Sequence, residues 1–222
     1  MTDYITAREF READGTEDWP VLGDGATAFF PTGSLAESVR LVQAISDLPR
    51  IEDFPPDIDV RPDGVTVRLM TYTPEWAGMH KRHVELGRQI SALAAEQGLK
   101  ADNSKVQSLI VVVGSPDPAE VMPFWEAALG YRRRADSPDE DLVDVHNRGT
   151  GFWFEDMDEP RADPGGAIHV GIWVPPDQAE ARVAAALAAG GRMVRDKYAP
   201  AWWTLADAAG NEADIATPLT RD

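Results

Sequence analysis

The sequence predicts an α+β protein built from two domains, and three observations support this. The chain has 222 residues, which is long for one small domain and enough for two separate cores. Its first half alternates short extended segments with two amphipathic helices. Its second half contains an internal repeat, in which Asp117 and Gly130 recur 60 residues later as Asp177 and Gly190.

The first half shows clear helix and hairpin signals. The segment ITAREF favours a short helix, and 26–30 looks extended. A longer helix is expected over 35–48, with Ser34 placed to cap it. The turn Pro62-Asp63-Gly64 separates two short alternating runs, which indicates a hairpin. A second long helix is expected over 83–99.

Each copy of the repeat has the same order of elements. An apolar strand is followed by a helix that starts at an aspartate, by a helix-ending glycine and then by chain rich in strand-forming residues. Each copy is therefore a βαβββ unit of about 50 to 60 residues, and two units make one domain. The polar connector KADNSK places the boundary between the halves, which gives domains over 1–102 and 103–222.

The composition indicates which classes of partner and which cellular compartment to expect. A net charge of −17 would repel phosphate backbones and anionic lipid heads, so we expect neither a nucleic acid nor a membrane as partner. No apolar run approaches the length of a membrane helix, and the polar, acidic start does not resemble a signal peptide. The absence of cysteine excludes disulfides and thiolate chemistry. We expect a cytoplasmic protein that acts on a small molecule.

Three stretches of the second half are similar to one superfamily. They are PFWEAALGY, IHVGIWV and LADAAGNEADIA, at 123–131, 168–174 and 205–216. Together they resemble the vicinal-oxygen-chelate superfamily, which includes glyoxalase I, bleomycin-resistance proteins and extradiol dioxygenases. The resemblance implies paired βαβββ modules whose curled sheets enclose a cleft.

The resemblance also implies candidate site residues. Superfamily members that use a metal take ligands from the first and last strand of each module, so His169, Asp214 and Glu155 are candidate ligands of a divalent ion. A fourth ligand is missing, because Leu109 stands where the repeat would place it. Glu212 shares a strand face with Asp214 and could contact substrate. Without a metal, His169 and the carboxylates could transfer a proton or simply line a pocket.

Tryptophans are frequent in this half. By strand alternation Trp153 and Trp173 share the face of the candidate ligands, whereas Trp202 and Trp203 point to opposite sides. We name Trp153, Trp173 and Trp203 as candidate walls for a flat aromatic ligand. The alternative is that these side chains fill the space between the curled sheets.

The first half, over about 8–98, resembles pterin-4a-carbinolamine dehydratase. The resemblance rests on DWPVLGDGATAFFPTGS, FPPDIDVRPDGVTVRLMTY and HVELGRQISALAAEQG. It implies an antiparallel sheet with helices on one face, a pterin ligand and a dehydration that histidines carry out. Asp53, Phe54 and Tyr72 occupy the positions of those histidines, so Asp53 and Tyr72 are the remaining candidates for the proton transfer. His80 and His83 could face one another, but a solvated helix end is expected there.

Three functions therefore remain open. The leading one is a bacterial small-molecule enzyme or binder with its cleft in the second domain, while the first domain docks, dimerises or presents ligand. The second is a pterin dehydratase, a lyase, with altered catalytic residues. The third is a non-catalytic protein that sequesters a cationic ligand in an acidic cleft shared by a homodimer.

Overall fold

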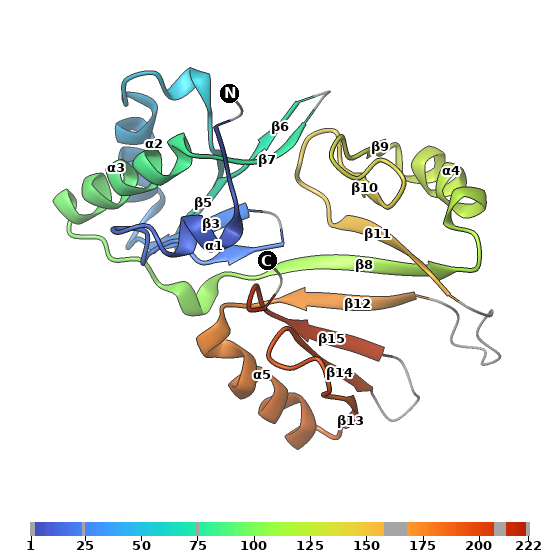
Figure 1. Cartoon of the computed structure of the whole chain (residues 1–222). Coiled ribbons are helices and arrows are strands. Elements are labelled where there is room, and N and C mark those ends of the chain that lie inside the picture. The colour runs from blue at the N-terminus through green and yellow to red at the C-terminus, as the bar shows by residue number, and fades with distance from the viewer. Residues whose placement is uncertain (1–2, 24, 74–75, 158–167, 207–211, 221–222) are drawn as a thin grey trace. The chain divides into compact units, whose positions relative to one another are not determined.

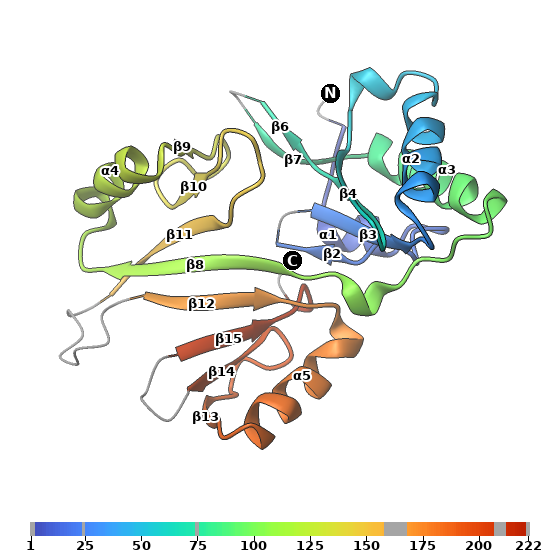
Figure 2. The ribbon, with the colours of Figure 1, turned by 180° about the vertical axis from the view of Figure 1, so that it is seen from behind.

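The computed structural model describes residues 3–23, 25–73, 76–157, 168–206 and 212–220. The chain divides into two compact units, of which the first contains Met1–Thr73 and Ala77–Val106 and the second contains Gln107–Arg221. Both units combine helices with sheets, which confirms the predicted α+β class. Figures 1 and 2 show the elements from two sides.

The first unit contains two antiparallel sheets, one of four strands in the order β2-β3-β5-β4 and one of three strands in the order β1-β7-β6. Its elements are β1 (Tyr4–Ile5), α1 (Ala7–Arg11), β2 (Val21–Leu22), β3 (Gly25–Pro31), α2 (Leu35–Ser46), the 3₁₀ turn η1 (Ile51–Asp53), β4 (Asp57–Arg61), β5 (Gly64–Leu69), β6 (Thr71–Tyr72), β7 (Ala77–His80), α3 (Arg82–Glu96) and the 3₁₀ turn η2 (Asn103–Lys105).

The core of this unit lies between the four-stranded sheet and the two long helices. Leu41 of α2, Ile90 of α3 and Val67 of β5 are fully buried and belong to the same apolar cluster. Trp19 is buried beside them, and its indole N–H donates to the carbonyl of Gly87, 3.1 Å away. The predicted helices and the predicted hairpin, which is β4 and β5, are confirmed.

The second unit consists of one eight-stranded sheet with the order β13-β14-β15-β12-β8-β11-β10-β9 and two helices. Each half is a βαβββ module, as the repeat predicts. The elements are β8 (Ser108–Ser115), α4 (Pro118–Leu129), β9 (Arg132–Arg133), β10 (Asp141–Val143), β11 (Gly151–Asp156), β12 (Ile168–Trp173), α5 (Pro176–Ala188), β13 (Arg192–Arg195), β14 (Trp202–Ala206) and β15 (Glu212–Ala216).

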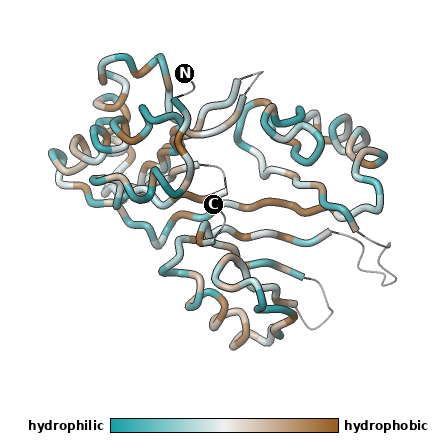
Figure 3. The backbone as a smooth tube through the Cα atoms, viewed as in Figure 1, coloured by the Kyte–Doolittle hydropathy of each residue, from teal (hydrophilic) through white to brown (hydrophobic). Residues whose placement is uncertain are grey.

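The first strands of the two modules, β8 and β12, pair antiparallel in the middle of this sheet. In Figure 3 β8 is coloured brown along much of its length, as expected for a central strand. The last strand of each module pairs in parallel with the first strand of the same module. β11 therefore lies beside β8 and β15 beside β12, on the two sides of the central pair.

Each helix of the second unit covers its own half of one sheet face. Met122 of α4 packs with Phe154 of β11, and Val183 of α5 packs with Ile215 of β15. Both helices are followed by a glycine with positive φ, Gly130 at 68° and Gly190 at 99°. Glycine recurs at this position of the repeat because it adopts positive φ without steric strain. Within the described residues, no helix is long and apolar enough to cross a membrane.

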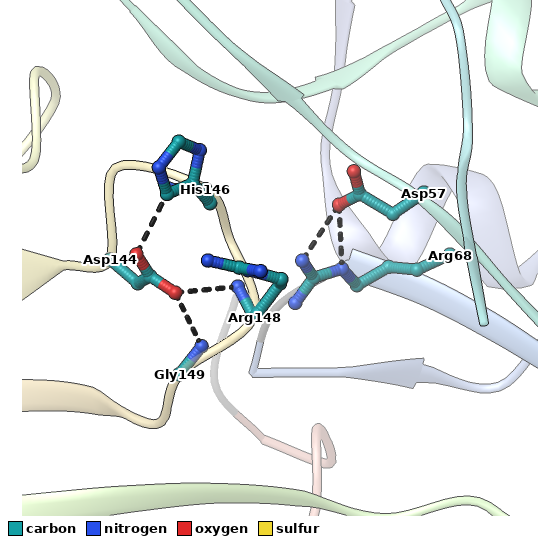
Figure 4. Close-up of polar contacts among 6 residues, drawn as sticks. All are labelled: Asp57, Arg68, Asp144, His146, Arg148 and Gly149. Atoms are coloured by element: carbon teal, nitrogen blue, oxygen red, sulfur yellow. Dashed lines mark hydrogen bonds and ion pairs between the residues drawn. The ribbon is translucent and has the colours of Figure 1, made fainter.

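Two carboxylates hold local structure in the two units, and Figure 4 draws their contacts. In the first unit Asp57 accepts from the guanidinium of Arg68, its partner on the neighbouring strand, at 2.7 Å. In the second unit Asp144 accepts the backbone N–H groups of His146, Arg148 and Gly149 at 3.0, 3.0 and 2.8 Å. These backbone bonds lower the pKa of Asp144.

Candidate functional site

The central strands of the second unit define one face of the sheet around His169. Val112 of β8 is the register partner of His169 on β12 and of Trp153 on β11. Register partners point to the same side of a sheet, so these three side chains share a face. Because alternate residues such as Ile172 pack with the helices, the His169 face is the one opposite α4 and α5.

His169 is paired with Asp214 on this face. Gly171 of β12 is the register partner of Asp214 on β15, so the carboxylate lies beside the strand that carries the imidazole. Nε2 of His169 lies 3.4 Å from Oδ2 of Asp214, and the two side chains are only 11% and 20% exposed. The sequence-predicted combination of a histidine and a carboxylate is therefore present in the described structure.

A third strand holds the carboxylate in place. Thr204 of β14 is the register partner of Asp214, and its hydroxyl donates to Oδ1 of Asp214 at 2.6 Å. Thr204 is only 4% exposed, so competing water has little access to this hydroxyl. The hydroxyl takes one carboxylate oxygen and leaves the other facing His169. Sequence reasoning missed Thr204, although its alternation with Trp203 and Leu205 signals a polar residue on the Asp214 side.

This arrangement suits proton transfer at one imidazole nitrogen. A carboxylate beside Nε2 can orient the ring. Within the described part of the chain, Nδ1 of His169 has no hydrogen-bond partner. Nδ1 is therefore the ring nitrogen that the described residues leave without a partner.

Glu155 is not brought to this pair. It is the register partner of Gly114, two residues along β8 from Val112, and β8 itself separates β11 from the strand of His169. Among the described residues, no group of three or more histidine, aspartate, glutamate or cysteine side chains is placed to hold a metal ion. The proposed ligands His169, Asp214 and Glu155 thus do not fit a shared metal centre.

The remaining polar candidates separate by strand position. Glu212 of β15 precedes Ala213, the register partner of Val170, and so lies next to His169 on the adjoining strand. The repeat offset of 60 matched His169 with Leu109. The sheet register instead pairs Leu109 with Ile172, so Leu109 lies on the helix-covered face and His169 on the other face. The offset identifies related elements, whereas the face depends on the pairing of the strands.

The tryptophans divide between the two faces. Trp153 shares the face of His169 and is 36% exposed. Trp173 and Trp202 are both register partners of Ala216, so they stand on either side of it on the His169 face. Trp203 instead packs into the core under α5. The indole at the expected wall position is therefore Trp202, and Trp203 contributes to packing.

In the first unit, Asp53 and Tyr72 belong to separate elements. Asp53 ends η1 and pairs with the guanidinium of Arg50 at 2.6 Å. Tyr72 lies in β6 and packs, partly buried, against the core of this unit. Their roles in a pterin reaction stay predictions.

His80 and His83 form a buried contact, which corrects the expectation of a solvated helix end. His83 is only 1% exposed. Its Nδ1 accepts the backbone N–H of His80 at 3.1 Å, and its Nε2 lies 3.3 Å from the hydroxyl of Thr71. The ring of His80 stacks on Phe54 with centroids 4.4 Å apart. Burial, with a smaller contribution from His80, lowers the pKa of His83 to about 4.

Residues 110–216 match the family model described as a glyoxalase-like domain. The match covers both modules of the second unit, the pair of His169 and Asp214, and Thr204. It supports the resemblance that the sequence shows in this half. The resemblance of the first half to a pterin dehydratase stays a prediction.

Three solved structures are similar to part of the chain. An NAD-dependent benzaldehyde dehydrogenase from Legionella pneumophila is 13% identical, with a TM-score of 0.37, over 49% of this chain and 97% of that one. A glyoxalase/bleomycin resistance protein/dioxygenase superfamily member from Vibrio splendidus 12B01 is 14% identical, with a TM-score of 0.34, over 50% and 99%. TioX from Micromonospora sp. ML1 is 18% identical, with a TM-score of 0.20, over 50% and 97%. No curated protein matches the chain.

Proposed function

We propose that the glyoxalase-like domain at 110–216 binds a small molecule on its His169 face, where His169 transfers a proton to or from that ligand. The observation that carries the proposal is the chain of contacts from Thr204 to Asp214 to His169. These three residues come from three neighbouring strands, β14, β15 and β12. Sheet pairing holds the strands, so the geometry does not depend on a loop.

Each residue of this chain has its own part in the proton transfer. Nδ1 of His169 removes a proton from the ligand, or returns one to it, as a general base or acid. The carboxylate of Asp214 fixes the ring and stabilises the positive charge that the imidazole gains. Thr204 is a positioning residue, because its hydroxyl holds the carboxylate without reaching the ligand. Trp153, Trp173 and Glu212 are the proposed ligand contacts.

The first experiment finds the ligand class. The tryptophans on the His169 face make intrinsic fluorescence a direct readout, so the full chain is titrated with dicarbonyls, catechols, glycopeptides and pterins. We expect quenching by one of the first three classes. A response to pterins that Tyr72→Phe removes and Trp153→Phe leaves unchanged would instead favour a dehydratase site in the first unit.

The second experiment tests the proton transfer. With a reactive ligand, His169→Gln should lower kcat by about 10²- to 10⁴-fold, because that is the usual contribution of a general acid or base. Its matched control is His146→Gln, since His146 lies in the exposed loop after β10 and, among the described residues, only its backbone N–H is bonded. His146→Gln should leave kcat unchanged. An unchanged kcat in His169→Gln would refute the proposed role.

A second candidate function is sequestration of a ligand without chemistry. It is favoured by Trp153, because this side chain lies on the same sheet face as His169, at the same register, and is substantially exposed. A sequestering protein would return the ligand unaltered after long incubation, and Trp153→Ala would weaken binding more than His169→Gln. Conversion of the ligand, together with loss of turnover in His169→Gln, would exclude this candidate.

A further inference from the structure

The first unit contains a small cavity between η1 and the start of α3. Its volume is about 290 Å³, which is at the low end of the roughly 300–1,000 Å³ typical of ligand sites and therefore suits a molecule with one ring. Its apolar wall includes Ile51, Phe54 and Leu86, and two arginines, Arg50 and Arg82, also line it. This site is independent of the function proposed for the second unit.

One of the two arginines is already neutralised. Both side-chain nitrogens of Arg50 that face Asp53 lie 2.6 Å from its carboxylate. The single acidic residue in the cavity wall is also engaged, because Glu85 accepts from the side chain of Gln89 at 3.1 Å and lies 3.8 Å from the guanidinium of Arg88. Arg50 and Glu85 therefore already have partners, and Arg82 is the remaining charged residue of the cavity wall.

Arg82 is the basic residue of the cavity wall whose charge no described residue compensates. Its backbone N–H donates to Nδ1 of His80 at 3.2 Å, but its guanidinium has no hydrogen bond or ion pair with any residue that the structure describes. The side chain is half-buried. A partly desolvated guanidinium without a carboxylate is unusual in a chain with 38 acidic and 21 basic residues. Carboxylate and phosphate oxygens match its forked donors.

The aromatic part of the apolar wall, Phe54, packs against two histidine rings. Phe54 stacks on His80, and its edge meets His83 with centroids 5.9 Å apart. A ring fixed in this way presents the same apolar surface to each ligand, which reduces the entropy lost on binding. The cavity wall thus combines Arg82, whose guanidinium has no partner among the described residues, with the stacked ring of Phe54 and the aliphatic side chains of Ile51 and Leu86.

We propose that this cavity binds a small aromatic carboxylate, whose anionic group pairs with Arg82 while its ring lies against Ile51, Phe54 and Leu86. Benzoate is the probe, and benzamide, which has the same shape without the charge, is its neutral control. Both are titrated into the full chain by calorimetry. We expect benzoate to bind with a Kd of about 1 mM, as its size allows, and benzamide to bind at least about tenfold more weakly.

Two variants assign the binding to Arg82. Arg82→Gln should weaken benzoate binding at least about tenfold, whereas Lys81→Gln, which removes the same charge from the preceding exposed residue, should change it less than about twofold. Equal effects of the two variants would refute the proposal, since they would indicate general attraction to a basic patch. Undetectable benzoate binding, or equal binding of benzamide, would refute it as well.

A measurement on the unaltered chain keeps the test independent of variant folding. In a methyl NMR titration, benzoate should shift the signals of Ile51 and Leu86 and leave that of Ile215, in the core of the second unit, in place. Shifts confined to methyl groups of the second unit would place the anion elsewhere and overturn the proposal.

Discussion

At the scale of single residues, His83 links a buried hydrogen-bond network to the pH dependence of stability. Its Nδ1 accepts the backbone N–H of His80, so the neutral ring carries its proton on Nε2 and donates to Thr71. Burial keeps the ring neutral down to a pKa of about 4. An unfolded chain takes up this proton near pH 6.5. Below that pH protonation therefore favours the unfolded state.

We expect the free energy of unfolding to fall by up to about 3 kcal/mol from this residue as the pH drops from 6.5 to 4. Urea titrations between pH 7 and 5 measure the upper part of this loss, where carboxylates contribute less. His83→Asn keeps an acceptor near the backbone N–H of His80 but cannot titrate. It should be less stable at pH 7 and show a shallower slope. An unchanged slope would contradict the assignment, and His146→Asn, at an exposed position, is the control.

Thr204 provides a second residue-scale prediction. Thr204→Val keeps the shape of the side chain but removes the hydroxyl that donates to Asp214. We expect kcat with the identified ligand to fall about tenfold, less than in His169→Gln, because the carboxylate loses orientation and not its charge. Thr204→Ser should restore most of the activity. If Thr204 only stabilised the fold, its substitution would lower the melting temperature, and Thr204→Val and Thr204→Ser would have the same kcat.

At the scale of elements, the hairpin of β4 and β5 depends on Gly64. A Cβ at this position would lie 2.4 Å from the ring of Phe29 and 2.8 Å from the carbonyl oxygen of Phe30. A backbone oxygen cannot move aside without disturbing the pairing of β3 with β5. Gly64→Ala should therefore destabilise the first unit by about 1–3 kcal/mol.

Urea unfolding of the full chain measures this change. Gly33→Ala is the control, because its added Cβ would meet only the end of the Glu37 side chain, at 3.2 Å. Equal loss of stability in the two variants would indicate a general cost of removing glycine.

The strength of a local signal decided which elements could be predicted. The helices α2 and α3 carry periodic apolar residues, and the turn at 62–64 has a distinctive composition, so both signals survive in the fold. The three-stranded sheet of β1, β6 and β7 was not predicted. Two of its strands, Tyr4–Ile5 and Thr71–Tyr72, contain only two residues each, and pairing of β1 with β7 joins segments that are distant in the sequence.

At the scale of the whole molecule, the chain contains separate apolar cores in its two units. Ile90 belongs to the core of the first unit and Phe154 to a cluster of the second. Each of Ile90→Ala and Phe154→Ala should cost about 2–5 kcal/mol in its own unit. We expect each variant to lower the unfolding transition of one unit more than that of the other. Hydrogen exchange resolved by segment measures this, and equal loss of protection in both units would contradict it.

The sequence by itself determined the α+β class, the two βαβββ modules and the approximate position of His169 and Asp214, because periodicity, repeats and strand alternation are local properties of the chain. Only the tertiary structure decided which of these residues meet. It brought His169, Asp214 and Thr204 into contact and placed Glu155 on the far side of β8. It also directed Trp203 toward the apolar core under α5 and buried His83 beside Thr71. Strand register and helix packing produce these contacts, and both depend on segments that are far apart in the chain.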